Sequence, residues 1–196
     1  MTRRLRILFG VALPALAVCL SAHARGPSEE DDEPQRRRKA TAAHDDVLRL
    51  ADSLDRDEDE IEKQAHAIAD KHNLESVMWL FKPRHKGGDG VEATLLALEK
   101  RALTPKELEA QRDDLIGMAK ATFAASRAAP LYASRYVSAD NGRAGKTWAR
   151  YCEDMKDSSQ DLLGALRADD VKALKKAVVA LNRSCTNCHT TDLSRR

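Results

Sequence analysis

Aromatic side chains are scarce in this sequence, in which Trp, Tyr and Phe make up 4% of 196 residues. Sandwiches and barrels of β-strands depend on aromatic and β-branched residues, so this scarcity argues against both folds. Charged residues are plentiful at 33%, and the abundant Ala, Leu, Lys and Arg favour helices. Nothing in the composition suggests two independent cores. We therefore expect an all-α protein with one main domain.

The sequence also lacks an excess of one charge. Its formal net charge is +2, which becomes −1 if residues 1–24 are removed, because that stretch holds three Arg and no acidic residue. Binding to the phosphates of nucleic acids needs Lys and Arg clustered on one face, and no helical pattern here has such a cluster. We expect no nucleic-acid partner.

No apolar run is long enough to cross a bilayer. The longest, residues 7–20, has 14 residues and is interrupted by Pro14, against about 20 residues for a spanning helix. Three Arg precede this run, and Ser-Ala-His-Ala at residues 21–24 follows it, an order typical of a secretory signal peptide. We expect residues 1–24 to be cleaved on export to the periplasm, with no stable membrane insertion afterwards. An uncleaved anchor, or a lipoprotein attached at Cys19, is the alternative.

Residues 25–40 contain no apolar stretch. They hold Gly, Pro and an acidic block at residues 29–33, followed by a basic block at residues 36–39. Without apolar side chains such a segment cannot offset the entropy that ordering would cost. We expect a flexible charged linker that leads into a helical domain over residues 41–196.

Apolar residues recur at three- and four-residue intervals in four segments, which predicts four amphipathic helices. These segments are residues 42–73, 104–130, 146–167 and 169 onward. Thr104 and Glu107 form a capping-box pattern at the start of the second helix. The last two helices are joined so closely that they must be antiparallel neighbours. We expect an antiparallel four-helix bundle, with a loop and short helix over residues 77–103 inserted between the first two main helices.

The motif Cys185-Thr186-Asn187-Cys188-His189 matches the C-x-x-C-H pattern of covalent haem attachment. Two thiols three residues apart on a helical turn can reach both vinyl groups of one porphyrin, and the following His can bind the iron. Both cysteines continue the apolar stripe of the last predicted helix. We expect one haem c per chain, attached through Cys185 and Cys188 and ligated axially by His189.

Three other interpretations of the motif are weaker. A thioredoxin-like redox pair belongs in a βαβ context, which this sequence lacks. A structural zinc site needs four ligands, and no second pair of ligands completes the set. A simple disulfide between Cys185 and Cys188 has poor geometry within a helix and leaves His189 unexplained. Cys152, on the apolar stripe of the third main helix, is predicted to be a buried and inert thiol.

A C-terminal C-x-x-C-H on the last helix of a predicted bundle, behind an export signal, resembles the class II c-type cytochromes, the cytochrome c-prime and cytochrome b562-like group. The likeness lies mainly in residues 148–193. Residues 78–84, followed by Gly87 and Gly88, resemble an element of class II-like cytochromes of planctomycete-type bacteria, although Asp89 stands where those sequences usually continue with an apolar residue. The resemblance to the c-prime group implies a five-coordinate haem that binds a small gas.

Two functions fit these patterns. The leading hypothesis is an electron carrier that docks with unidentified periplasmic redox proteins. The alternative is a five-coordinate haem protein that binds or senses a small gas such as nitric oxide. An enzyme is not expected, because no distal His and Arg pair can be identified. Homodimer formation stays open.

The sixth iron position separates these two functions. In a plain bundle the neighbours of the haem would be Val47, Leu50, Phe123, Trp148 and Tyr151. Met78 would then lie at the far end of the first helix, tens of Å from the iron, since a helix rises 1.5 Å per residue. A segment that folds back as a lid could instead bring Met78 to the iron. We name Met78 as the candidate sixth ligand, against the simpler interpretation that it caps the core.

Overall fold

The computed structural model of the protein describes residues 29–54, 56–136 and 142–190. Within these ranges the chain is helical and contains no strand, which confirms the predicted all-α class. The predicted signal peptide and Cys19 lie outside the described residues. No helix in the described part of the chain is long and apolar enough to span a membrane.

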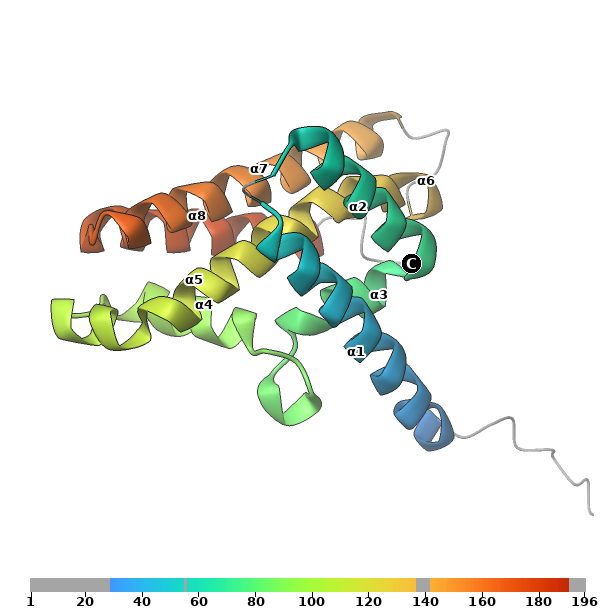
Figure 1. Ribbon diagram of the computed structural model, residues 1–196, viewed down its shortest axis with the longest axis horizontal. Coiled ribbons are helices and arrows are strands. Elements are labelled where there is room, and N and C mark those ends of the chain that lie inside the picture. Colours follow the sequence, from blue (N-terminus) through green and yellow to red (C-terminus); the bar gives the residue numbers. More distant parts are fainter. Residues whose placement is uncertain (1–28, 55, 137–141, 191–196) are drawn as a thin grey trace, which may run out of the picture.

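The chain forms long helices and several short helical turns (Figure 1). In order these are α1 (Glu29–Asp52), α2 (Glu58–Lys71), α3 (Leu74–Val77), the 3-10 helix η1 (Met78–Phe81), the 3-10 helix η2 (Arg84–Lys86), α4 (Val91–Lys100), α5 (Pro105–Ala128), the 3-10 helix η3 (Ala129–Tyr132), α6 (Ala133–Tyr136), α7 (Gly142–Arg167) and α8 (Val171–Thr190).

Three of the long helices, α5, α7 and α8, lie side by side (Figure 1). The turn between α7 and α8 is short because Asp169 adopts a left-handed conformation, with φ of 54°. Asp170 then caps α8: its carboxylate accepts hydrogen bonds from the backbone N–H groups of Lys172 (2.9 Å) and Ala173 (3.0 Å). This turn confirms that the last two predicted helices are antiparallel neighbours.

The first predicted helix, residues 42–73, is two helices in the structure. The chain leaves the helix at Ser53, whose hydroxyl donates a hydrogen bond to the carbonyl of Arg49 (2.9 Å). Asp57 starts α2 by accepting from the N–H of Asp59 (3.0 Å), and the acidic first turn suits the positive end of the helix dipole. The break turns α2 back, so that α1 crosses α5 and α2 also packs on α5 (Figure 1).

Part of the predicted linker is helical as well, since α1 begins at Glu29 rather than near residue 41. Its contacts explain the difference. Ala40 and Ala43 are buried, and the preceding turns of α1 lie against α3 and η1. These contacts join residues about forty positions apart, so composition alone could not reveal them.

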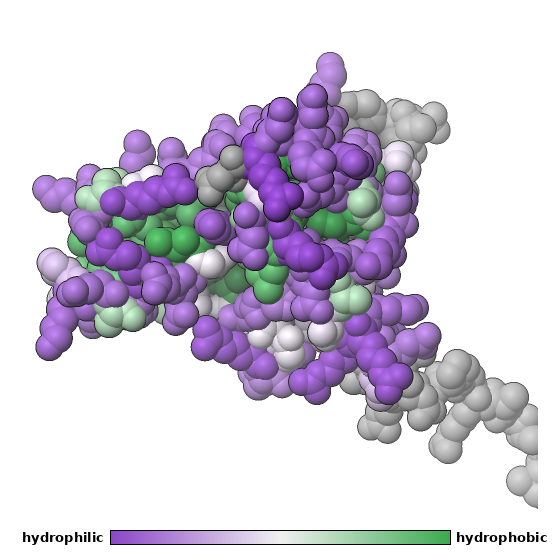
Figure 2. Space-filling model, in the orientation of Figure 1, coloured by the Kyte–Doolittle hydropathy of each residue, from purple (hydrophilic) through white to green (hydrophobic). Residues whose placement is uncertain are grey.

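One apolar core joins these helices. It includes the almost fully buried Leu50 of α1, Leu80 of η1, Leu115 of α5 and Leu181 of α8. The face of the molecule in Figure 2 is mainly hydrophilic, and hydrophobic side chains show in the furrow between α5 and α7. The core therefore holds α1, η1, α5 and α8 in fixed relative positions, and with them the residues of the candidate site.

Candidate functional site

The C-x-x-C-H motif occupies the last two turns of α8, as the apolar stripe of the last predicted helix indicates. Leu174, Val178 and Leu181 anchor this helix in the core. One turn further along the same stripe, Cys185 and Cys188 are half-buried, and the adjacent His189 is exposed. The helix therefore carries both thiols from the core out to the surface.

Both thiols and His189 line one pocket. The pocket encloses about 860 Å³ of empty space, counted together with its open mouth. Its walls come from α8, α7, η1 and α4, with Ala129 of η3 beside them.

The wall from α7 is aromatic and sulfur-rich. Trp148, Tyr151, Cys152 and Met155 are all buried and all line the pocket. The indole N–H of Trp148 donates to the carbonyl of Ala129 (3.1 Å), which fixes the ring. Of the five residues predicted to adjoin a haem, only Trp148 and Tyr151 line this pocket, and the remaining three are buried elsewhere in the core: Val47, Leu50 and Phe123.

The wall from η1 brings Met78 into the pocket, together with Phe81. The expectation that a straight first helix keeps Met78 tens of Å from the motif is therefore wrong. The break between α1 and α2 reverses the chain, so the segment that follows α2 lies beside α4 and α1. Met78 is half-buried and packs on the core, so it caps the core and lines the pocket at once.

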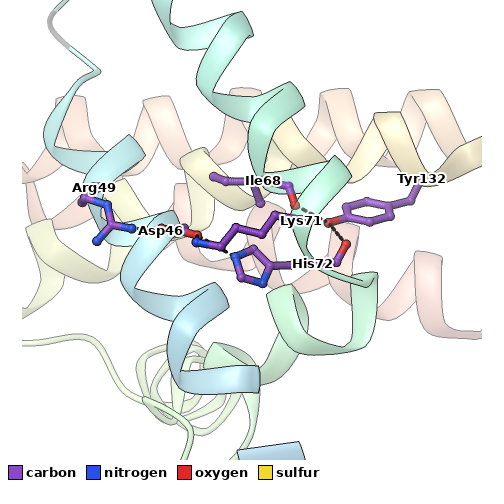
Figure 3. Close-up of polar contacts among 6 residues, drawn as sticks. All are labelled: Asp46, Arg49, Ile68, Lys71, His72 and Tyr132. Atoms are coloured by element: carbon purple, nitrogen blue, oxygen red, sulfur yellow. Dashed lines mark hydrogen bonds and ion pairs between the residues drawn. The ribbon is translucent and has the colours of Figure 1, made fainter. Parts of the chain in front are cut away.

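A cluster of polar contacts fixes the turn that leads to Met78. Figure 3 shows Asp46 of α1 pointing at the end of α2, where its carboxylate accepts from the Nζ of Lys71 (2.8 Å) and lies 2.6 Å from the Nε2 of His72. Arg49 also pairs with Asp46. Tyr132 donates from its hydroxyl to the carbonyl of His72 (3.0 Å). These contacts determine where the chain leaves α2, six residues before Met78.

The wall from α4 was missed by the sequence analysis, which treated residues 91–103 only as part of an insertion. Leu95 is almost fully buried and lines the pocket, and Glu92 lies one turn before it. The Nζ of Lys175 on α8 donates to the carbonyl of Leu98 (3.1 Å) and contacts that of Glu99. These bonds link α4 to α8, so the pocket residues on the two helices keep fixed relative positions.

Burial keeps the pocket thiols protonated at neutral pH. It raises the pKa of Cys152 to about 12 and, with a smaller contribution from Cys188, that of Cys185 to about 11. The pKa of Cys188 is raised for the same reason. Thiols with such values are poor nucleophiles, so spontaneous oxidation or alkylation is slow. Cys152 is buried as predicted, and it lies in the pocket as a third thiol.

The donor set fits a covalently attached haem. Two thiols at the attachment spacing, an imidazole beside them and a thioether from η1 surround a cavity with mostly apolar walls. The described residues contain no group of three or more His, Cys, Asp and Glu that is already gathered as a site for a bare metal ion.

Comparisons with known proteins give no relative from which a function could be transferred. No protein-family model matches the chain. Searches of curated proteins and of solved structures found no significant match.

Proposed function

We propose that this chain is an exported c-type cytochrome that carries one haem c and transfers electrons in the periplasm. One observation carries the proposal: Cys185, Cys188 and His189 line a single apolar pocket that Met78 also lines. The signal-peptide pattern of residues 1–24 supports export, and export would bring the chain to the compartment where haem c is attached.

Each residue would have a distinct task. Cys185 and Cys188 would hold the porphyrin through two thioether bonds, His189 would be the proximal iron ligand, and Met78 would be the sixth ligand. Trp148 and the other apolar wall residues would keep water from the iron. When bound, the haem supplies reversible one-electron chemistry, and its partners would be periplasmic redox proteins.

The arrangement of the helices can be related to the same family of cytochromes. We infer that α5, α7 and α8 correspond to three of the four antiparallel helices of the class II c-type cytochromes, and that α1, which crosses α5, takes the place of the fourth. The elements from α2 to α4 would then be the insertion, and the insertion would supply the ligand Met78. A sixth ligand favours an electron carrier over the alternative, a gas-binding protein with a five-coordinate haem.

Covalent attachment is the decisive test. The full chain is produced in a host that attaches haem c, and the periplasmic fraction is examined by haem staining after denaturing electrophoresis and by the spectrum of the reduced protein in alkaline pyridine. We expect the wild type to stain, the double variant C185A/C188A to lose the stain, and the control Cys152→Ala to keep it. An unstained wild type, or a double variant that stains as strongly as the wild type, would overturn the proposal.

Ligation is tested separately from attachment, because the two use different atoms. The variant His189→Ala keeps both thiols and loses the imidazole. We expect covalent haem with an altered ferrous spectrum. An unchanged spectrum would exclude His189 as the proximal ligand.

A further inference from the structure

The pocket wall formed by α4 contains a single fully charged side chain. Among the residues that line the pocket in the described part of the chain, Glu92 is the only Asp, Glu, Lys or Arg. The other lining residues are apolar, aromatic, sulfur-containing or neutral polar, apart from the titratable His189. Glu92 itself is exposed. Water therefore screens its charge on the outer side, and only the side that faces the apolar wall is unscreened.

Glu92 has a defined position because α4 is fixed at both ends. At the start, Gly90 precedes the helix in a left-handed conformation, with φ of 73°, and its N–H donates to the carbonyl of Lys82 (2.9 Å). At the end, Lys175 and Asn182 of α8 bind Leu98 and Glu99. Between these anchors, Val91 and Leu95 are buried.

The carboxylate also lies close enough to act on the attachment site. Burial is the main reason for the high pKa of Cys185. A hydrogen bond with Ser184 lowers this pKa, and Cys188 and, after it, the negative charge of Glu92 raise it. The field of Glu92 therefore reaches the side chain that would bind the haem.

From this arrangement we infer that Glu92 tunes the redox equilibrium: its negative charge stabilises the oxidised, more positive state of the haem iron and lowers the reduction potential. This inference rests on the proposed haem attachment at Cys185 and Cys188. Reduction transfers one electron from a redox partner to the ferric iron and lowers the charge of the site by one unit. A nearby carboxylate opposes that change.

The test is an optical redox titration of the haem-loaded full chain. We compare the wild type with Glu92→Gln, which removes the charge, Glu92→Asp, which keeps it, and Glu92→Lys, which reverses it. The control Glu109→Gln makes the same change of net charge at a position of α5 that is exposed like Glu92 but does not line the pocket.

We expect the ferrous-to-ferric ratio at a fixed ambient potential to rise about two- to threefold in Glu92→Gln, as suits an exposed charge, where tenfold corresponds to 59 mV for one electron. Glu92→Lys should raise it further, and Glu92→Asp and Glu109→Gln should stay near the wild type. Equal shifts in the Gln and Asp variants, no shift in the Gln variant, or loss of haem from the Gln variant would overturn the inference. None of these results would alter the haem stain of the wild type, which alone decides the proposed attachment.

Discussion

The Nε2 atom of His72 lies 2.6 Å from the Oδ2 atom of Asp46, which joins the end of α2 to the C-terminal half of α1. Both side chains are nearly buried, at 7% and 12% exposure. A carboxylate can only accept, so the imidazole donates from Nε2. Burial, followed by the charges of Lys71 and Arg49, lowers the pKa of His72 below its usual value.

This relationship predicts how stability depends on pH. The folded state binds a proton at His72 less readily than the unfolded chain does, whose His pKa is about 6.5. The contribution of His72 is therefore fully present above that value, and it is lost as the pH falls toward the lower folded pKa. We expect His72→Gln to flatten the loss of stability between about pH 7.5 and 5 in denaturant titrations. The control is His66→Gln, because His66 is 55% exposed. Equal slopes for both variants would contradict the prediction.

The second prediction on stability concerns the substitution of Gly88 by Ala. A Cβ atom there would lie 2.2 Å from the carbonyl oxygen of Lys82 and 2.5 Å from that of Trp79. Both are backbone atoms next to η1, so the clash cannot be relieved by a side-chain rotation. We expect Gly88→Ala to lower the free energy of unfolding by about 1–3 kcal/mol.

The matched control for Gly88 is Gly117→Ala within α5, where nothing lies within 4 Å of the added Cβ. This change should raise the free energy of unfolding by about 0.5–1 kcal/mol, because Ala favours a helix over Gly. Thermal unfolding of both variants measures the difference. A Gly88→Ala variant as stable as the wild type would show that the loop is free to adjust.

Met78 predicts the coordination state of the iron. If its thioether is the sixth ligand, Met78→Ala converts a low-spin haem into a high-spin one that binds carbon monoxide in the ferrous state. Met155→Ala is the control, because that side chain lines the same pocket from α7. Absorption spectra of both variants with and without carbon monoxide decide the ligand. A wild type that is already high-spin and binds carbon monoxide would favour the gas-binding alternative.

Local patterns in the sequence were sufficient for several elements. The capping box at Thr104 forms as predicted, with the side chain of Glu107 accepting from the N–H of Thr104 (2.8 Å). The stripe of α8 places Cys185 and Cys188 on the inner side of that helix. Caps and stripes depend on residues three or four positions apart, so they can be read without knowledge of the fold.

The composition of the pocket was decided by tertiary contacts. Asp46 and His72 are 26 positions apart, and their contact fixes the turn that brings Met78 to the motif. Lys175 holds α4 across 77 positions, which makes Glu92 part of the wall. The sequence by itself determined α5, α7 and α8 and the motif that α8 carries. Which other residues line the pocket around Cys185, Cys188 and His189 depended on buried contacts between distant segments. No periodic pattern in the sequence encodes contacts of that range.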